Sequence, residues 1–257
     1  MLMAVKNGPA RLHVRIAGDG PTLVLLPGMA RPATDLDPFA ALLVKAGYRV
    51  VQPDPRGIGG STGPLENITL HDLAADVAAV IQAAGGAPAV VIGHAFGNRV
   101  ARCTAADRPD LVHAVVLLSS SGKVQPSAEI AEAIKIAQDA SQPRAARAEA
   151  ARKAWFGPGR DISIWLDGWV EPVRVAQTAA AAATDVADWW TAGRANVLIV
   201  QGLADVSAPP ANGRLLKDEI GDRATLVELE GIGHAVPIED PAAVADVVLA
   251  WLRNHPG

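Results

Sequence analysis

Six short apolar runs, separated by longer stretches with helical periodicity, limit what this chain can fold into more than any other feature. The runs cover residues 22–26, 49–52, 89–92, 114–118, 197–200 and 225–229. Within each run the apolar residues follow one another instead of alternating with polar ones, which is typical of strands buried on both faces of a parallel sheet. Because parallel strands need helical crossovers, the pattern predicts an α/β fold with a doubly wound, mostly parallel sheet.

The remaining local patterns agree with this architecture. Thr69, with Asp72 three residues later, has the spacing of a helix N-cap, and the apolar residues after it recur on one helical face. Pro241 begins a last amphipathic helix. Near the N-terminus Leu12 and its apolar neighbours at every second position alternate with polar residues, which predicts a half-exposed strand at an antiparallel edge.

Residues 122–193 interrupt this alternation. They contain no convincing strand, and several alanine-rich helical patterns are separated by prolines. We therefore predict a helical lid at residues 122–193, inserted between two parts of one core at residues 1–121 and 194–257. Tryptophan is concentrated here, and we expect these side chains to line a pocket for an apolar or aromatic substrate. They are Trp155, Trp165, Trp169, Trp189 and Trp190.

Composition and charge exclude several classes of function. The formal net charge of −4 argues against nucleic-acid binding, since an acidic surface repels phosphate backbones. No apolar stretch approaches the ~18 residues that a membrane span needs, and residues 1–8 lack the apolar core of a signal peptide, so we expect a cytoplasmic protein. Cys103 is the single cysteine, which excludes an intrachain disulfide. The remaining candidate metal ligands show no ligand spacing: His13, His71, His113 and His255.

Three of the predicted strands end in loops with chemically useful residues. The sequence Gly93-His94-Ala95-Phe96-Gly97 follows the third run and leads into a helical pattern. Asp205 follows the fifth run, and His234 follows the sixth. Ligands of parallel sheets bind at the carboxyl ends of the strands, so these loops predict a single site.

In these motifs the chain resembles the α/β-hydrolase fold family, in particular its esterases and lactonases. The first motif has the frame of the nucleophile elbow, G-x-S-x-G, and the order elbow, acid, histidine is also that of the family. Leu26-Pro27-Gly28-Met29 resembles the family's oxyanion loop, with Pro27 where histidine is more common. Residues 54–61 resemble the family's D-x-R-G-x-G-x-S loop. The resemblance implies an α/β-hydrolase fold with a helical lid.

The resemblance also implies a role for each site residue. His234 would act first as general base and then as general acid, and Asp205 would orient its ring. The backbone N–H groups of Met29 and Phe96 would form the oxyanion hole. Ser120, just after the fourth run, is a candidate for contact with the substrate.

Ala95 departs from the family pattern because it stands where the nucleophile would be. A methyl group cannot attack a carbonyl and offers His234 no proton to remove, so acyl-enzyme chemistry cannot run through this position. One reading is that alanine replaces a serine that was removed to trap a substrate complex. The other is that alanine is native, with His234 and Asp205 acting as a general-base dyad in non-covalent chemistry, or with no catalysis and only the binding of a small molecule.

The sequence therefore predicts a hydrolase of carboxylic esters or lactones with an apolar or aromatic moiety, inactive or impaired as it stands because of Ala95. We expect a small-molecule substrate as its partner, without nucleic acid or membrane, and leave a homodimer open. The family chemistry implies neither a cofactor nor a metal.

Overall fold

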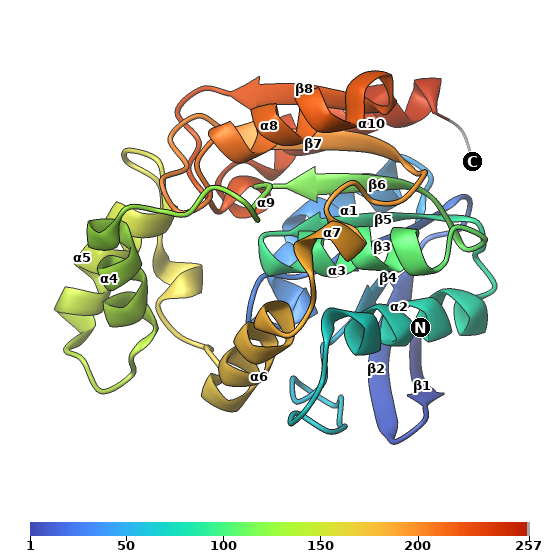
Figure 1. Ribbon diagram of the computed structural model, residues 1–257, viewed down its shortest axis with the longest axis horizontal. Coiled ribbons are helices and arrows are strands. Elements are labelled where there is room, and N and C mark those ends of the chain that lie inside the picture. The colour runs from blue at the N-terminus through green and yellow to red at the C-terminus, as the bar shows by residue number, and fades with distance from the viewer. Residues whose placement is uncertain (256–257) are drawn as a thin grey trace.

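An eight-stranded sheet forms the centre of the computed structural model, which describes residues 1–255 (Figure 1). The strand order is β1-β2-β4-β3-β5-β6-β7-β8; β1 and β2 run antiparallel to their neighbours, and the other strand pairs are parallel. The strands are β1 (Leu2–Asn7), β2 (Ala10–Ala17), β3 (Thr22–Leu26), β4 (Arg49–Pro53), β5 (Ala89–His94), β6 (Val112–Leu118), β7 (Asn196–Gly202) and β8 (Ala224–Leu229). Every one of the six apolar runs lies in a strand of the parallel part, which confirms the predicted fold class.

The two edges of the sheet differ from the prediction. The strand predicted around Leu12 is β2, which lies one position inside the edge because β1 covers it. The sequence shows no clear signal for β1, since half of its residues are exposed and only Val5 is buried. At the other edge, residues 226–229 of β8 are only half-buried, because no further strand pairs with it. The sixth apolar run is therefore not buried on both faces.

Helices cover both faces of the sheet. One face packs against α1 and α10 through side chains that include Phe39, Leu43 and Val248. The other packs against α2, α3 and α8 through side chains that include Val80 and Leu216. The helices are α1 (Asp37–Lys45), α2 (Leu70–Ala84), α3 (Phe96–Asp107), α4 (Ala128–Gln138), α5 (Arg144–Trp155), α6 (Glu171–Ala182), α7 (Val186–Trp189), α8 (Ala211–Ile220), α9 (Val236–Glu239) and α10 (Pro241–Asn254).

The predicted helix starts are confirmed. The Thr69 side chain accepts a hydrogen bond from the Asp72 backbone N–H, and the Asp72 carboxylate accepts one from the Thr69 backbone N–H, so a capping box begins α2. Pro241 is the first residue of α10, where its missing N–H has no helical partner to lose. Among residues 1–255 no helix is both long and apolar enough to cross a bilayer.

Helices α4 to α7 lie between β6 and β7 and divide into two parts. Figure 1 shows α4 and α5 beyond the carboxyl ends of β6 and β8, where they build an apolar cluster of their own around Trp155 and Trp165. Helix α6 and the end of α7 instead join the main core next to α2 and α3, for example through Ala180 and Trp189. The boundaries at residues 122 and 193 stay a prediction, and the last two residues of the predicted second core part, 256–257, lie outside the described residues.

Candidate active site

Strand β5 meets helix α3 in a tight turn at Ala95. The backbone of Ala95 has φ 50° and ψ −111°, a conformation that L-residues rarely adopt. Glycines allow the turn to pack closely: a Cβ on Gly93 would lie 2.4 Å from the carbonyl carbon of Gly97, and one on Gly97 would lie 2.5 Å from the carbonyl oxygen of Leu26. The turn is thereby pressed against the end of β3 and presents the Ala95 side chain at the carboxyl edge of the sheet.

The carboxylate of Asp205 follows β7 and is fully satisfied by hydrogen bonds. Its Oδ1 accepts from the backbone N–H groups of Ser207 and Ala208 at 3.0 and 2.7 Å. Its Oδ2 accepts from Gln201 Nε2 at 3.1 Å and lies 2.9 Å from His234 Nδ1. Because the carboxylate side chain is wholly buried, these partners hold it in one orientation toward the histidine.

The backbone of His234 is fixed from both sides. Its N–H donates to the Trp155 carbonyl at 2.7 Å. Its own carbonyl accepts from His94 Nε2 at 2.9 Å and from the Ser119 hydroxyl at 2.6 Å. With Nδ1–H directed at Asp205, the lone pair of the ring is on Nε2, which is the form that can take a proton.

The carboxyl end of α5 connects the two loops that carry this dyad. The Trp155 carbonyl accepts from the N–H groups of both His234 and Ala235, and the Ala154 carbonyl accepts from the Ser207 hydroxyl at 2.7 Å. The last carbonyls of a helix have no partner within it, so these bonds satisfy them. Helix α5 therefore holds the acid loop and the histidine loop in register.

A cavity of about 180 Å³ lies over these groups. Ala95 and His234 both line it, and Trp155, Trp165 and Trp169 form an aromatic wall. Trp155 and Trp169 are stacked with ring centroids 4.9 Å apart, and Trp165 meets both rings edge-on. The rest of the lining is Met29, Phe96, Arg99, Ser121, Ile134, Gln138, Ser207 and Ala208.

Two backbone N–H groups beside the cavity are free to bind an oxyanion. Met29 and Phe96 both line the cavity, and within residues 1–255 neither of their N–H groups has an acceptor. Phe96 is the first residue of α3, where the helix dipole favours negative charge. A Cβ on Gly28 would lie 3.9 Å from that of Ala95, so the loop with Met29 borders the turn directly. The oxyanion-hole role of these two N–H groups stays a prediction.

The comparisons with known proteins agree with this geometry. Residues 21–162 match the family model for the alpha/beta hydrolase fold, and residues 168–255 match a model described as TAP-like protein. The chain belongs to the alpha/beta hydrolase fold family. A non-heme chloroperoxidase of Streptomyces lividans is 29% identical over 92% of this chain and 93% of that protein. A protein of Variovorax paradoxus named as a carbamate hydrolase is 33% identical over 138 residues, and the match spans about half of its length.

Solved hydrolase structures share the whole architecture of this alpha/beta hydrolase. An esterase of Exiguobacterium antarcticum matches with a TM-score of 0.83 over 98% of this chain and 100% of its own, at 18% identity. A thermophilic esterase of Thermogutta terrifontis matches with a TM-score of 0.80 over 99% of this chain and 98% of its own, at 21% identity. At 18% and 21% sequence identity, this structural similarity establishes the fold alone.

Three of the predicted pocket residues lie elsewhere. Trp189 and Trp190 pack beneath α3, where the Arg102 guanidinium lies 4.5 and 4.9 Å from their ring centroids, because α7 belongs to the main core. Ser120 is wholly buried, its N–H donates to Gln201 Oε1, and it is absent from the cavity lining. Its neighbour Ser121 lines the cavity instead.

Several residues that position the dyad and the aromatic wall were not predicted from the sequence. Gln201 positions the acid, because its Nε2 donates both to Asp205 and to the Ala208 carbonyl. A polar residue at the end of an otherwise apolar strand is the sequence signal that points to such a role. Arg31 and Asp35 form a buried pair at 2.6 Å that holds the aromatic wall, since Asp35 accepts from Trp165 Nε1 and Arg31 lies 4.9 Å from the Trp169 ring centroid. Only the tertiary structure brings these groups to the wall.

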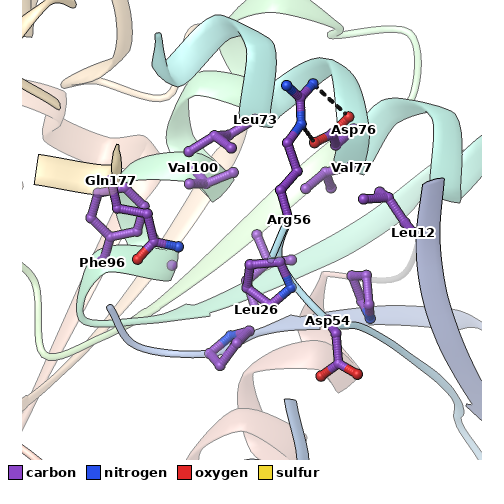
Figure 2. Close-up of a pocket in the computed structure, with 14 residues that line it drawn as sticks. Leu12, Leu26, Asp54, Arg56, Leu73, Asp76, Val77, Phe96, Val100 and Gln177 are labelled. Atoms are coloured by element: carbon purple, nitrogen blue, oxygen red, sulfur yellow. Dashed lines mark hydrogen bonds and ion pairs between the residues drawn. The ribbon is translucent and has the colours of Figure 1, made fainter. Parts of the chain in front are cut away.

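A second, smaller cavity of about 50 Å³ lies under α2, away from the dyad (Figure 2). Figure 2 shows Arg56 pointing toward Asp76, with Leu12, Leu73 and Val77 around the pair. The guanidinium makes two hydrogen bonds to this carboxylate, at 2.5 and 3.0 Å. Arg56 and Asp76 are paired with each other, and Asp54, which also lines the cavity, accepts a hydrogen bond from the Ala33 backbone N–H at 2.9 Å. Because its charged groups have partners and its walls are otherwise mainly apolar, we interpret this region as a connection between the Arg56 loop and α2.

One group of side chains among residues 1–255 brings donor atoms within metal-binding range. His71, for which the sequence showed no ligand spacing, lies with Cys103 and Asp107 such that the three donor atoms are within 4.8 Å of one another. The His71 Nδ1 to Asp107 Oδ2 distance is 2.8 Å, whereas two ligands of a tetrahedral zinc ion with bonds of about 2.0 Å lie about 3.3 Å apart. The distance is that of an ion pair joining α2 to α3. Burial raises the pKa of the Cys103 thiol, which keeps it protonated.

His94 gives the fold a sensitivity to acid. Burial, followed by the nearby His234, lowers the pKa of His94 to about 3 from 6.5. The unfolded chain therefore binds one more proton than the folded one between these values, and the stability present above pH 6.5 is lost as the pH falls toward 3. We expect His94→Gln to reduce the pH dependence of the unfolding free energy in this window by up to about 1.4 kcal/mol per pH unit. Urea unfolding at several pH values measures this, and equal slopes for parent and variant would contradict it.

Proposed function

We propose that this site is that of a hydrolase of carboxylic esters or lactones with an apolar or aromatic moiety, in which Ala95 takes the place of the nucleophilic serine. The observation that carries the proposal is the bond of 2.9 Å between His234 and the buried Asp205, beside a cavity that Ala95 also lines. The unpaired N–H groups of Met29 and Phe96 support it further. Together these groups are everything that acyl transfer requires except the attacking atom.

A serine at residue 95 would supply that atom. His234 would take the hydroxyl proton as the oxygen attacks the substrate carbonyl, and would then pass it to the leaving alcohol. Met29 and Phe96 would hold the oxyanion, and water would hydrolyse the acyl-enzyme by the same steps. With Ala95 the chain binds the substrate but forms no acyl-enzyme. Turnover of a panel of aromatic esters and lactones by the Ala95→Ser variant, compared with the unchanged chain, tests this proposal.

A second candidate is hydrolysis without a covalent intermediate. The intact dyad favours it, because the Asp205 carboxylate keeps all its hydrogen bonds and His234 can still accept a proton. In this case His234 would activate water directly, and the unchanged chain would hydrolyse esters or lactones. Activity of the unchanged chain that His234→Ala abolishes would favour this candidate, whereas activity seen only after Ala95→Ser would favour the first.

The aromatic wall predicts the selectivity of the site. The Trp169→Ala variant removes one stacked ring of the wall, worth about 0.5–1.5 kcal/mol, so we expect binding of an aromatic ligand to weaken by about 2- to 10-fold. Trp190→Phe is the matched control, since Trp190 lies away from the cavity. Titration of each protein with benzamide by calorimetry measures the effect. Equal weakening of benzamide binding in both variants would show that Trp169 does not contact the ligand.

A further inference from the structure

Arg99 is an unpaired cation beside the candidate active site. It lies on α3 and lines the same cavity as Ala95 and His234. It is the only Lys, Arg, Asp or Glu residue among those that line this cavity. Within residues 1–255 no carboxylate lies within ion-pair distance of its guanidinium, whereas the buried Arg31 and Arg56 each have an aspartate partner.

The surroundings of Arg99 orient the side chain without neutralising it. Its Nε donates to the Ser121 hydroxyl at 3.3 Å, and its guanidinium lies 5.9 Å from the Trp189 ring centroid. Burial lowers the pKa of Arg99, and no carboxylate offsets this. Arginine nevertheless stays charged in proteins, so a half-buried positive charge without a carboxylate partner lines the cavity. Placing such a charge beside an apolar wall costs free energy unless a ligand pairs with it.

We propose that Arg99 forms a carboxylate-binding subsite, so that the substrate carries an anionic carboxylate as well as its reacting carbonyl. The planar guanidinium matches a carboxylate with two parallel hydrogen bonds. Ser121 and Gln138 line the same cavity and can donate further hydrogen bonds to the anion. The aromatic wall would then contact the apolar part of the same molecule.

The place of Arg99 on its helix limits the shape of this substrate. Arg99 is three residues after Phe96, which is a rise of about 4.5 Å along α3. Phe96 and Arg99 line one cavity of about 180 Å³, so a molecule that reaches both would be small. The reaction that follows binding depends on the proposed function, but the anion site does not.

Binding of benzoate and its neutral isostere benzamide tests the subsite on the unchanged chain. We expect calorimetry to show at least a 10-fold preference for benzoate. Arg99→Met should weaken benzoate binding by about 10- to 100-fold, the loss of a charge-assisted pair, and so remove the preference. Arg99→Lys should retain part of it, because lysine keeps the charge without the planar geometry. Arg214→Met, which removes an exposed arginine on α8, should leave the preference unchanged.

The outcomes separate this inference from the proposed function. Equal affinity of the unchanged chain for the two probes, failure to bind benzoate, or a preference retained by a folded Arg99→Met would each overturn the subsite. If circular dichroism shows that Arg99→Met does not fold, the benzoate preference of Arg99→Lys is compared with that of the parent chain. An unaltered preference in Arg99→Lys would overturn the subsite. A benzoate preference together with an inert Ala95→Ser variant would support the subsite and reject the ester or lactone reaction.

Discussion

Replacing Ala95 by serine is expected to increase the hydrolysis of aromatic esters or lactones by about 10⁴-fold or more, because loss of a triad nucleophile removes activity on that scale or larger. The substitution adds one hydroxyl to an existing Cβ, so the strained backbone at φ 50° has no new conformational cost. The new oxygen would face a cavity that already contains the His234 imidazole and the two unpaired N–H groups. Steady-state kcat/KM on a panel of esters and lactones measures the gain.

The controls for this prediction isolate the nucleophile from the rest of the site. Ala95→Gly relieves the backbone strain without supplying an attacking atom, and it should stay inactive. Adding His234→Ala to the serine variant should remove most of the gain, since the base is then lost. A folded Ala95→Ser protein that binds benzoate but hydrolyses none of the panel would count against the triad reading of this site.

Replacing Asp76 by alanine is expected to lower the free energy of unfolding by about 3–5 kcal/mol, because it leaves the buried Arg56 guanidinium without a counter-charge. Both side chains are 6% exposed, and the pair makes two hydrogen bonds, at 2.5 and 3.0 Å. Asp76 also accepts a hydrogen bond from Asn7 Nδ2, which joins β1 to α2. The variant therefore weakens both the Arg56 loop and the edge strand.

Urea unfolding of matched variants tests the ion pair. Asp110→Ala breaks an exposed pair with Arg108 and should cost no more than about 1 kcal/mol. The double variant Arg56→Met with Asp76→Leu removes both charges, and we expect it to be more stable than Asp76→Ala alone. A loss below about 1 kcal/mol for Asp76→Ala would show that water reaches the guanidinium.

The sequence predicted the parallel sheet for a physical reason, whereas the roles of His234 and Asp205 came from the resemblance to the α/β-hydrolase fold family. Burial on both faces demands continuous apolar runs, and five of the six runs lie in the largely buried strands β3 to β7, while the sixth lies in the half-buried edge strand β8. A tight strand-to-helix turn demands glycines, which Gly93 and Gly97 supply. Such local demands are visible in the sequence of a single segment, whereas β1, with only one buried residue, shows no such pattern.

Which tryptophans face the cavity was decided only by the tertiary structure. All five lie in one helical segment, yet Trp155, Trp165 and Trp169 form the wall while Trp189 and Trp190 pack on Arg102. The same holds for Gln201, which bonds Asp205, and for the unpaired Arg99. Burial and counter-charge depend on residues distant in the chain. The amino-acid order by itself therefore determined the sheet and the loops at its carboxyl edge, and long-range packing decided which side chains line the cavity.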